Sequence, residues 1–374
     1  MKKVGIMSMQ RIANYGSFLQ AYALKQLMEE VGCNVEFVDY HVGAPVITEN
    51  ADSKNKVVRK IEKGLETFQY RAPLAHKLSF IRYKQSFAQK YMPLLGITDE
   101  MNYNPTVDCL VIGSDEVFNC IQKNSNVGYS PELFGKNNHA KKLITYAASF
   151  GNTTLIKLEK YKKANEVGAL LKKFDAISVR DTNSGTIVEQ LTGKEPVYNL
   201  DPVLTYDYMN CCDKIPQVQT NEKYLILYAY AGRISNDEAD WIAAYAKKKN
   251  LKVYAIGDIQ KCADRFVDCS PFEVLAYFRN AEEVITDTFH GSIFSVITHR
   301  PFATLIRKSV GNSYGNEEKL SDLLNRLGLT ERMTTKVEET EHINQQPIDY
   351  EKVDDVLQKQ REIAKAYLCQ SIGE

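Results

Sequence analysis

The chain has 374 residues, of which 44% are hydrophobic and 25% charged, and its formal net charge is zero. A zero net charge gives no support for bulk binding to nucleic acid or to an anionic membrane. Because one hydrophobic core seldom serves more than about 250–300 residues, we expect two domains.

The cysteines and the apolar runs indicate a cytoplasmic protein. None of the eight cysteines belongs to a Cys-x-x-Cys pair, so we expect reduced, structural thiols. No secretory signal is visible, and no apolar run approaches the roughly 20 residues that cross a bilayer. Basic stretches between residues 54 and 90 leave open a peripheral contact with a membrane, although a solvated helical face is the simpler explanation.

The first half of the chain alternates strands and helices. Val4–Met9 and Asn34–Tyr40 have the apolar character of strands, and Ser17–Gly32 between them has apolar residues at helical spacing. Ser17 and Gln20 have the spacing of a capping box, which predicts the start of this helix. A strand–helix–strand unit of this kind predicts a parallel sheet.

We expect the N-terminal domain to cover residues 1–205. Residues 50–100 are less regular and basic, and we interpret them as a helical insertion. Further strands of the same sheet are predicted at 109–112, 143–148 and 176–179. The polar, irregular segment 206–222 is the predicted boundary.

A second α/β series predicts a C-terminal domain over residues 223–374. Its clearest helix starts are Ser235 with Glu238, and Ser270 with Pro271 and Glu273. Residues 350–368 form a closing amphipathic helix. The expected fold class is α/β, with two Rossmann-like domains that face each other across a ligand-binding cleft.

Two polar segments follow predicted strands in the first domain. Asn14-Tyr15-Gly16-Ser17 lies between the first strand and its helix, where free N–H groups can hold an anion, although a turn with an N-cap explains the segment too. Gly113-Ser114-Asp115-Glu116 follows the strand at 109–112. Its hydroxyl and carboxylate suit a substrate hydroxyl, and a capping turn is the alternative.

Two further segments carry an arginine and a histidine at strand ends. Arg180 is costly to bury without an anion, which is either the neighbouring Asp181 or a substrate carboxylate or phosphate. His290 follows the strand Val284–Ile285, where it either moves protons near neutral pH or caps a helix. Asp287 lies three residues before it, at a distance along the chain that suits orienting the imidazole or binding substrate.

Several familiar site types are not supported by the sequence. The chain has no Gly-x-Gly-x-x-Gly, no P-loop, no Gly-x-Ser-x-Gly and no Asp-x-Asp. Its remaining histidines are scattered, so we predict no metal site.

Six segments, taken in order, resemble motifs of the polysaccharide pyruvyl transferase family over about residues 2–333. They are Asn14–Leu24, Gly113–Asn119, Tyr146–Gly151, Ser178–Arg180, Leu200–Pro202 and Thr286–Gly291.

The resemblance implies a GT-B-like fold and a defined reaction. Pyruvate would move from phosphoenolpyruvate to a sugar of a cell-surface polysaccharide precursor, forming a ketal and releasing phosphate, with no cofactor and no metal. His290 would be the acid/base and Asp287 would orient it, while Arg180 would hold the donor's anionic groups. The other expected substrate-binding residues are Asn14, Tyr15, Gly16, Ser17, Ser114, Asp115, Thr288, Gly291 and Ser292.

Two positions depart from the family pattern. Thr288 stands where some members have an arginine, and Lys319 stands where the family tends to have one. The alternatives are therefore a metal-independent glycosyltransferase that uses a nucleotide sugar, and a non-catalytic glycan-binding relative. The sequence does not identify the acceptor sugar, and a nucleotide-linked and a lipid-linked acceptor both stay open.

Overall fold

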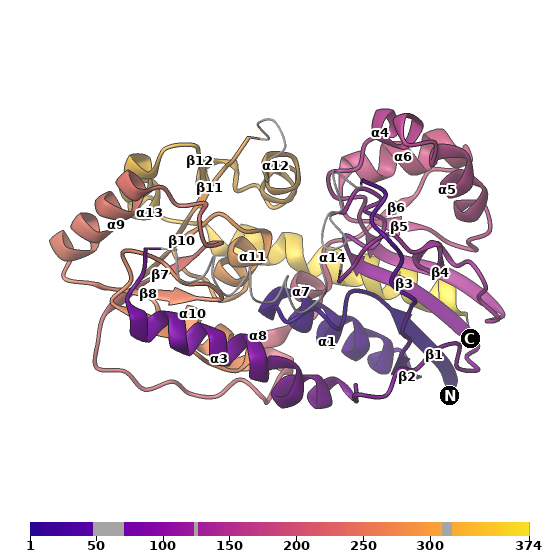
Figure 1. Ribbon diagram of the computed structural model, residues 1–374, viewed down its shortest axis with the longest axis horizontal. Helices are drawn as coiled ribbons and strands as arrows, with labels where there is room; N and C mark the ends of the chain where they lie inside the picture. The colour runs from indigo at the N-terminus through magenta and orange to yellow at the C-terminus, as the bar shows by residue number, and fades with distance from the viewer. Residues whose placement is uncertain (48–70, 123–125, 309–315, 374) are drawn as a thin grey trace.

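The computed structural model describes residues 1–47, 71–122, 126–308 and 316–373, and it contains two parallel sheets, each covered by helices (Figure 1). The first sheet has six strands in the order β2-β1-β3-β4-β5-β6. Their bounds are β1 Lys2–Met7, β2 Cys33–Phe37, β3 Cys109–Asp115, β4 Lys142–Ala148, β5 Ser178–Val179 and β6 Val197–Tyr198.

The second sheet also has six strands, in the order β12-β11-β10-β7-β8-β9. Their bounds are β7 Tyr224–Tyr228, β8 Lys252–Ile256, β9 Arg265–Val267, β10 Glu283–Thr286, β11 Phe302–Leu305 and β12 Met333–Thr334. Numbered within this half, the order is 3-2-1-4-5-6, which is that of the Rossmann fold. The first sheet begins 2-1-3-4-5, as in flavodoxin-like folds. The predicted α/β fold with two Rossmann-like halves is confirmed.

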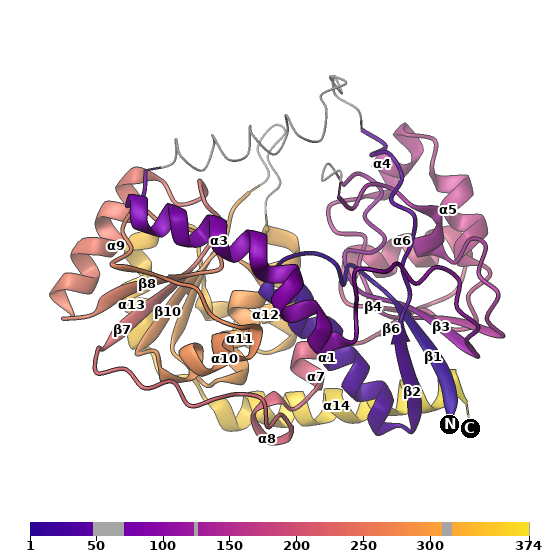
Figure 2. The same cartoon turned by 60° about the horizontal axis from the view of Figure 1, so that its bottom comes forward.

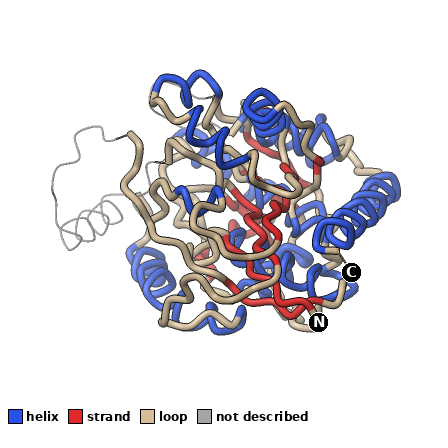
Figure 3. The backbone as a smooth tube through the Cα atoms, turned by 90° about the vertical axis from the view of Figure 1, so that its right-hand side faces the viewer, coloured by secondary structure: helices blue, strands red, loops and turns tan. Residues whose placement is uncertain are grey.

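Helices surround both sheets, and the strands lie inside (Figure 3). The helices of the first half and its connection to the second are α1 Tyr15–Glu30, α3 Leu74–Tyr91, α4 Leu155–Lys160, α5 Ala164–Leu171, α6 Thr182–Thr192, α7 Pro202–Thr205 and α8 Tyr208–Cys211. The later helices are α9 Asn236–Lys248, α10 Pro271–Asn280, α11 Phe289–Ile297, α12 Glu317–Arg326, α13 Thr340–Gln345 and α14 Tyr350–Ile372. Within the described residues, no helix combines the length and the apolar character that crossing a bilayer requires.

The start of α1 differs from the prediction. Its N-cap is Asn14, whose side-chain oxygen accepts a hydrogen bond from Gly16 N, so the predicted start at Ser17 is wrong. An asparagine outcompetes the later serine because its carboxamide reaches the free N–H two residues on. The capping boxes predicted at Ser235 and Ser270 are both confirmed, at α9 and α10.

Two helices tie the halves of the chain together (Figure 2). The C-terminal helix α14 runs back to the first sheet, where the hydroxyl of Tyr367 donates to the carbonyl of Thr145 at 2.7 Å and Lys2 Nζ donates to the carbonyl of Ile372 at 3.0 Å. Helix α3, from the predicted insertion, packs on β9 of the second sheet. Residues 50–70 of that insertion lie outside the described residues, and the predicted domain boundaries stay a prediction.

The core is continuous between the halves. One cluster of buried apolar side chains extends from β1 and α1 to β7 and β10, and a second cluster covers the other face of the first sheet. Helix α1 is buried along most of its length and contacts α10 of the second half. The fold therefore brings the start of α1 close to the second sheet.

The return of α14 yields a test of what stabilises this arrangement. Leu368 is fully buried, whereas Ile363 on the same helix is 44% exposed. We expect Leu368→Ala to lower the free energy of unfolding by about 2–5 kcal/mol, because it leaves a cavity in the core. Ile363→Ala is the matched control, expected within about 0.5 kcal/mol of the parent. Urea unfolding followed by circular dichroism measures both, and equal effects would contradict the packing of α14 described above.

Candidate functional site

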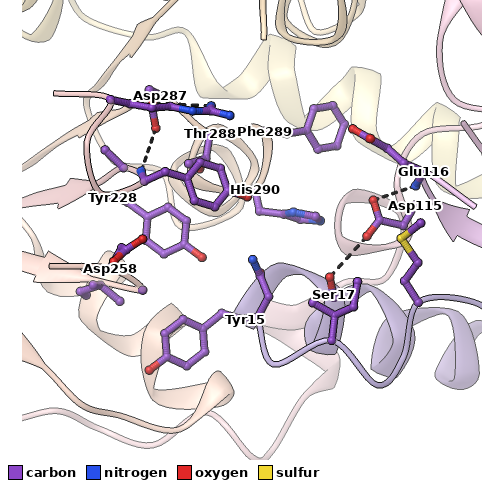
Figure 4. Close-up of a pocket in the computed structure, with 18 of the residues that line it drawn as sticks. Tyr15, Ser17, Asp115, Glu116, Tyr228, Asp258, Asp287, Thr288, Phe289 and His290 are labelled. Carbon is purple, nitrogen blue, oxygen red and sulfur yellow. Dashed lines mark hydrogen bonds and ion pairs between the residues drawn. The ribbon is translucent and has the colours of Figure 1, made fainter. Parts of the chain in front are cut away.

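A cavity of about 340 Å³ lies between the two halves, at the carboxyl ends of the strands. Its walls come from the segments that follow β1, β3 and β5 in the first half and β7, β8 and β10 in the second. Figure 4 shows that side chains from both halves converge there, with His290 near the centre. In parallel α/β sheets this is the edge where ligands bind.

His290 lies in the first turn of α11, and its imidazole is held between the halves. Its Nε2 is 3.8 Å from Asp201 Oδ2, and a Cβ placed on Gly16 would overlap the ring. Glycine at position 16 therefore gives the imidazole its place against the start of α1. Burial lowers the pKa of His290, while the carboxylates of Asp201 and Asp115 act in the opposite direction.

Arg180 is almost fully buried and is paired with two carboxylates. It donates to Asp201 Oδ2 at 3.1 Å and to Asp115 Oδ1 at 3.3 Å, and its guanidinium lies 4.5 Å from the ring centre of Phe289. Burial alone would lower the pKa of Arg180, but these carboxylates raise it above its usual value. The group is a permanent cation whose charge the protein already balances.

Asp115 faces the cavity because its backbone is in the left-handed region, with φ of 81°. Its Oδ2 accepts a hydrogen bond from the Ser17 hydroxyl at 3.4 Å, and its Oδ1 accepts from Glu116 N at 2.9 Å. Burial would raise the pKa of Asp115, but the charge of Arg180 holds it below its ordinary value. Asp115 is thus an ionised carboxylate on the cavity wall.

Two helix N-termini meet at the cavity from opposite halves. The Asn14 side chain caps α1 through Gly16 N at 2.7 Å, and the Thr288 hydroxyl caps α11 through Gly291 N at 2.9 Å. The other N–H groups of a first helical turn have no acceptor within their helix. The aligned peptide dipoles add positive potential at both starts, which favours an anion.

Asp287 belongs to the wall on the side of the second sheet. Its Oδ1 accepts a hydrogen bond from Tyr230 N at 3.3 Å, and Arg233 Nη1 lies 3.7 Å from its Oδ2. Burial raises the pKa of Asp287, and the charge of Arg233 opposes that shift. Among the described carboxylates, the one within 4 Å of a His290 ring nitrogen is that of Asp201 and not that of Asp287, and at 3.8 Å it forms no hydrogen bond with Nε2.

The charged side chains on the described cavity wall balance. Four cationic and four acidic residues line it: Lys84, Arg180, Arg233 and Lys319, and Asp115, Glu116, Asp258 and Asp287. Lys319 Nζ, on α12, is paired with Glu116 Oε1 at 3.2 Å. A net attraction for anions therefore depends on the two helix N-termini and on the protonation of the carboxylates.

The structure separates the predicted site residues into two layers. On the cavity wall it places Asn14, Tyr15, Ser17, Asp115, Arg180, Asp287, Thr288 and His290. Behind the wall lie Gly16, Ser114, Gly291 and Ser292: Ser114 and Ser292 are fully buried, and a Cβ on Gly291 would overlap the Thr286 and Thr288 hydroxyls. Tyr15 uses its hydroxyl to reach the carbonyl of Cys269 in the other half, at 2.8 Å.

Sequence reasoning did not assign several wall residues to the site. Arg233, Tyr230 and Asp258 were not singled out, and Asp201, which lies behind the wall, was named only within the motif segment Leu200–Pro202. Asp258 lies two residues after the strand at 252–256, so the rule that polar residues at strand ends line the ligand site would have found it. Among the described residues, no group of three or more His, Cys, Asp or Glu side chains is arranged to hold a metal ion.

A profile of the polysaccharide pyruvyl transferase family matches residues 14–309. No curated protein sequence matches the chain.

Several solved structures are similar to this chain in fold. The S. aureus MnaA structure with UDP shares 11% identical residues, with 96% of this chain and 90% of that chain covered and a TM-score of 0.48. The UDP-GlcNAc 2-epimerase of Methanocaldococcus jannaschii shares 9%, with 93% of each chain covered and a TM-score of 0.49. The spinosyn rhamnosyltransferase SpnG shares 10%, with 100% and 96% covered and a TM-score of 0.37.

The environment of His290 predicts its titration. We expect a pKa below the ordinary 6.5, because burial disfavours the imidazolium. Lys319→Gln should raise this pKa, since the charge of Lys319 lowers it. The control is Lys336→Gln, at an exposed lysine paired with Glu339, which should leave the pKa of His290 unchanged. NMR of histidine-labelled protein, with the signal assigned by His290→Gln, measures the pKa.

The same shift has a consequence for stability. A histidine whose pKa is lower in the folded than in the unfolded chain makes folding less favourable as the pH falls below about 6.5, because the unfolded chain then binds more protons. His290→Gln should therefore weaken the loss of stability on acidification below that pH. A pKa of 6.5 or higher in the parent protein would contradict the buried, neutral imidazole.

Proposed function

This chain belongs to the polysaccharide pyruvyl transferase family, and we propose that it transfers pyruvate from phosphoenolpyruvate to a sugar. The product is a cyclic ketal on two hydroxyls of a cell-surface polysaccharide precursor, and phosphate is released. Because phosphoenolpyruvate is a metabolite of the cytoplasm, we also propose that the reaction takes place there.

The observation that carries the proposal is the position of His290. Its imidazole lies at the centre of a cavity bounded by two helix N-termini and a buried arginine. Burial keeps it neutral near pH 7, because its pKa is lowered. A neutral imidazole next to Asp201 and Asp115 is able to accept a proton, and its low pKa makes it a good donor afterwards.

The proposed mechanism uses this property in two directions. The proton of the first sugar hydroxyl passes through His290 to C3 of phosphoenolpyruvate, which becomes the methyl group. The hydroxyl oxygen bonds to C2, which the protonation of C3 has made oxocarbenium-like. The bond between C2 and the phosphate oxygen breaks, and the second hydroxyl attacks C2. The proton of the second hydroxyl leaves with the phosphate, so atoms and charges balance.

The anionic groups of the donor need positive potential. We propose that the start of α1 supplies it, because the charges of Arg180 and Lys319 are already balanced by carboxylates. Arg180 also holds Asp115 and Asp201 in place through its two ion pairs. Thr288, where some members have arginine, serves as the N-cap of α11 in this chain.

Substitution of His290 tests the mechanism. His290→Gln should reduce formation of the ketal at least 100-fold, because general acid–base catalysis contributes about 10²–10⁴. The control is His299→Gln, at an exposed histidine paired with Asp354, which should retain parental activity. Release of phosphate from phosphoenolpyruvate and the NMR signal of the ketal methyl group measure turnover with a panel of nucleotide-linked and lipid-linked sugars.

Two results would contradict the proposal. A His290→Gln variant with more than half of the parental rate would exclude the role of the imidazole. Consumption of a nucleotide sugar with no turnover of phosphoenolpyruvate would show glycosyl transfer instead.

The close approach of Gly16 to His290 yields a second test. Gly16→Ala should displace the imidazole and lower the rate about 100-fold, since a displacement of about 1 Å costs that much. Gly168→Ala is the control, because a Cβ at Gly168 meets its neighbours only at 3.4 Å, an ordinary contact. Equal rates for the two variants would show that position 16 does not hold the catalytic ring.

A further inference from the structure

The half of the cavity that the second sheet builds contains polar groups that pyruvyl transfer does not use. They lie at the ends of β7, β8 and β10. We propose that this half binds the nucleoside diphosphate part of a nucleotide-linked acceptor, with the ribose at Asp258 and the diphosphate between Arg233 and the start of α11. The inference rests on the proposed function, because it names the form in which the acceptor sugar arrives.

The topology of the second sheet places a ligand here. Strands β7, β8 and β9 extend the sheet in one direction, and β10 returns to the other side of β7. The switch point is therefore between β7 and β10, and in open α/β sheets ligands bind outside the carboxyl ends of the strands at such a point. Ala229 and Tyr230 after β7, and Thr288 after β10, line the cavity on either side of it.

Asp258 has the position of a ribose-binding acid. It lies two residues after β8, the second strand of this half, where an acidic residue of a Rossmann fold accepts from ribose hydroxyls. Its oxygens are held by Ala231 N at 3.0 Å and Ile259 N at 2.9 Å, and a carboxylate has acceptor sites beyond these two. Gly257 before it, with φ of +85°, keeps side-chain atoms off this wall beside Tyr228.

The anion contacts differ from those of a dinucleotide site. Helix α9, which follows β7, begins with a capping box whose Glu238 is paired with Arg307 at 2.7 Å, and an acidic residue there disfavours a diphosphate. The start of α11 has no acidic residue in its first turn, and Arg233 lies beside it near Asp287. These contacts fit the two phosphates of one nucleotide.

Asp287 indicates where the sugar lies. Its Oδ2 is fully buried and accepts no hydrogen bond from the described part of the chain, although its ion-pair partner Arg233 lies 3.7 Å away. A buried carboxylate oxygen without a donor is costly, so a hydroxyl of the ligand is its natural partner. Because Asp287 and His290 flank the start of α11, a sugar bound to Asp287 is directed towards the catalytic imidazole.

Calorimetric titration with UDP, GDP and ADP, each beside its 2′-deoxy form and beside inorganic pyrophosphate, tests the inference without turnover. At least one nucleoside diphosphate should bind, and its 2′-deoxy form should bind about tenfold more weakly. Asp258→Asn should weaken the binding of that nucleoside diphosphate about tenfold and abolish the preference for ribose over deoxyribose. The binding of pyrophosphate should be unchanged. Arg233→Gln should weaken the binding of both the nucleoside diphosphate and pyrophosphate.

The matched control is Asp240→Asn, at an exposed carboxylate on α9 that pairs with Lys261 at 2.6 Å, and it should bind as the parent does. The comparison of ribose with deoxyribose in the parent protein keeps the test valid if a variant fails to fold. Equal binding of the two forms would overturn the ribose contact, and unchanged binding by Arg233→Gln would overturn the diphosphate contact.

Failure of this inference and failure of the proposed function give different results. If no nucleoside diphosphate binds but the protein turns over phosphoenolpyruvate with a lipid-linked sugar, the nucleotide site is wrong and the function stands. If a nucleoside diphosphate binds as described and its sugar is transferred without turnover of phosphoenolpyruvate, the site stands and the function is wrong.

Discussion

The buried guanidinium of Arg180 is the group on which the arrangement of the site depends. A cation taken out of water needs carboxylate partners of good geometry, and removing one partner of such a pair costs several kcal/mol. Arg180 obtains them from Asp115 at the end of β3 and Asp201 before α7. The second half is attached to the same point, because Arg326 donates to the carbonyl of Arg180 at 2.9 Å.

This network determines the state of the histidine as well as its position. Asp115 and Asp201 favour a proton on His290, whereas Arg180, Lys319 and burial oppose it. The balance leaves a ring that is neutral near pH 7 and that has two carboxylates ready to stabilise it when it gains a proton. A group of this kind suits a reaction in which one proton is first removed and then delivered, as the proposed transfer requires.

The two halves also divide the chemistry between them. The first half contributes the ion-pair network and the start of α1, while the second contributes His290 and the wall with Asp258 and Asp287. The hydroxyl of Tyr15 reaches across to Cys269, and α14 returns from the second half to the first sheet. Because Gly16 of one half touches His290 of the other, any change in how the halves pack alters the position of the imidazole.

The sequence by itself determined the fold class, the family and much of the local structure, although the helix start that the spacing predicts at Ser17 lies instead at Asn14. Apolar strands alternate with capped helices, and the capping boxes at Ser235 and Ser270 form as the spacing predicts, because these interactions join residues only three apart. The motif segments, including Asn14–Leu24 and Thr286–Gly291, were recognisable for the same reason.

Only the tertiary structure decided which groups meet. The sequence proposed Asp287 as the partner of His290, from a separation of three residues, but the carboxylate beside the ring comes from Asp201, which is 89 positions away in the sequence. The sequence left Arg180 either with Asp181 or with a substrate, and the fold gives it Asp115 and Asp201 instead. Such pairings depend on how strands far apart in the chain are ordered in a sheet, and local spacing holds no information about that order.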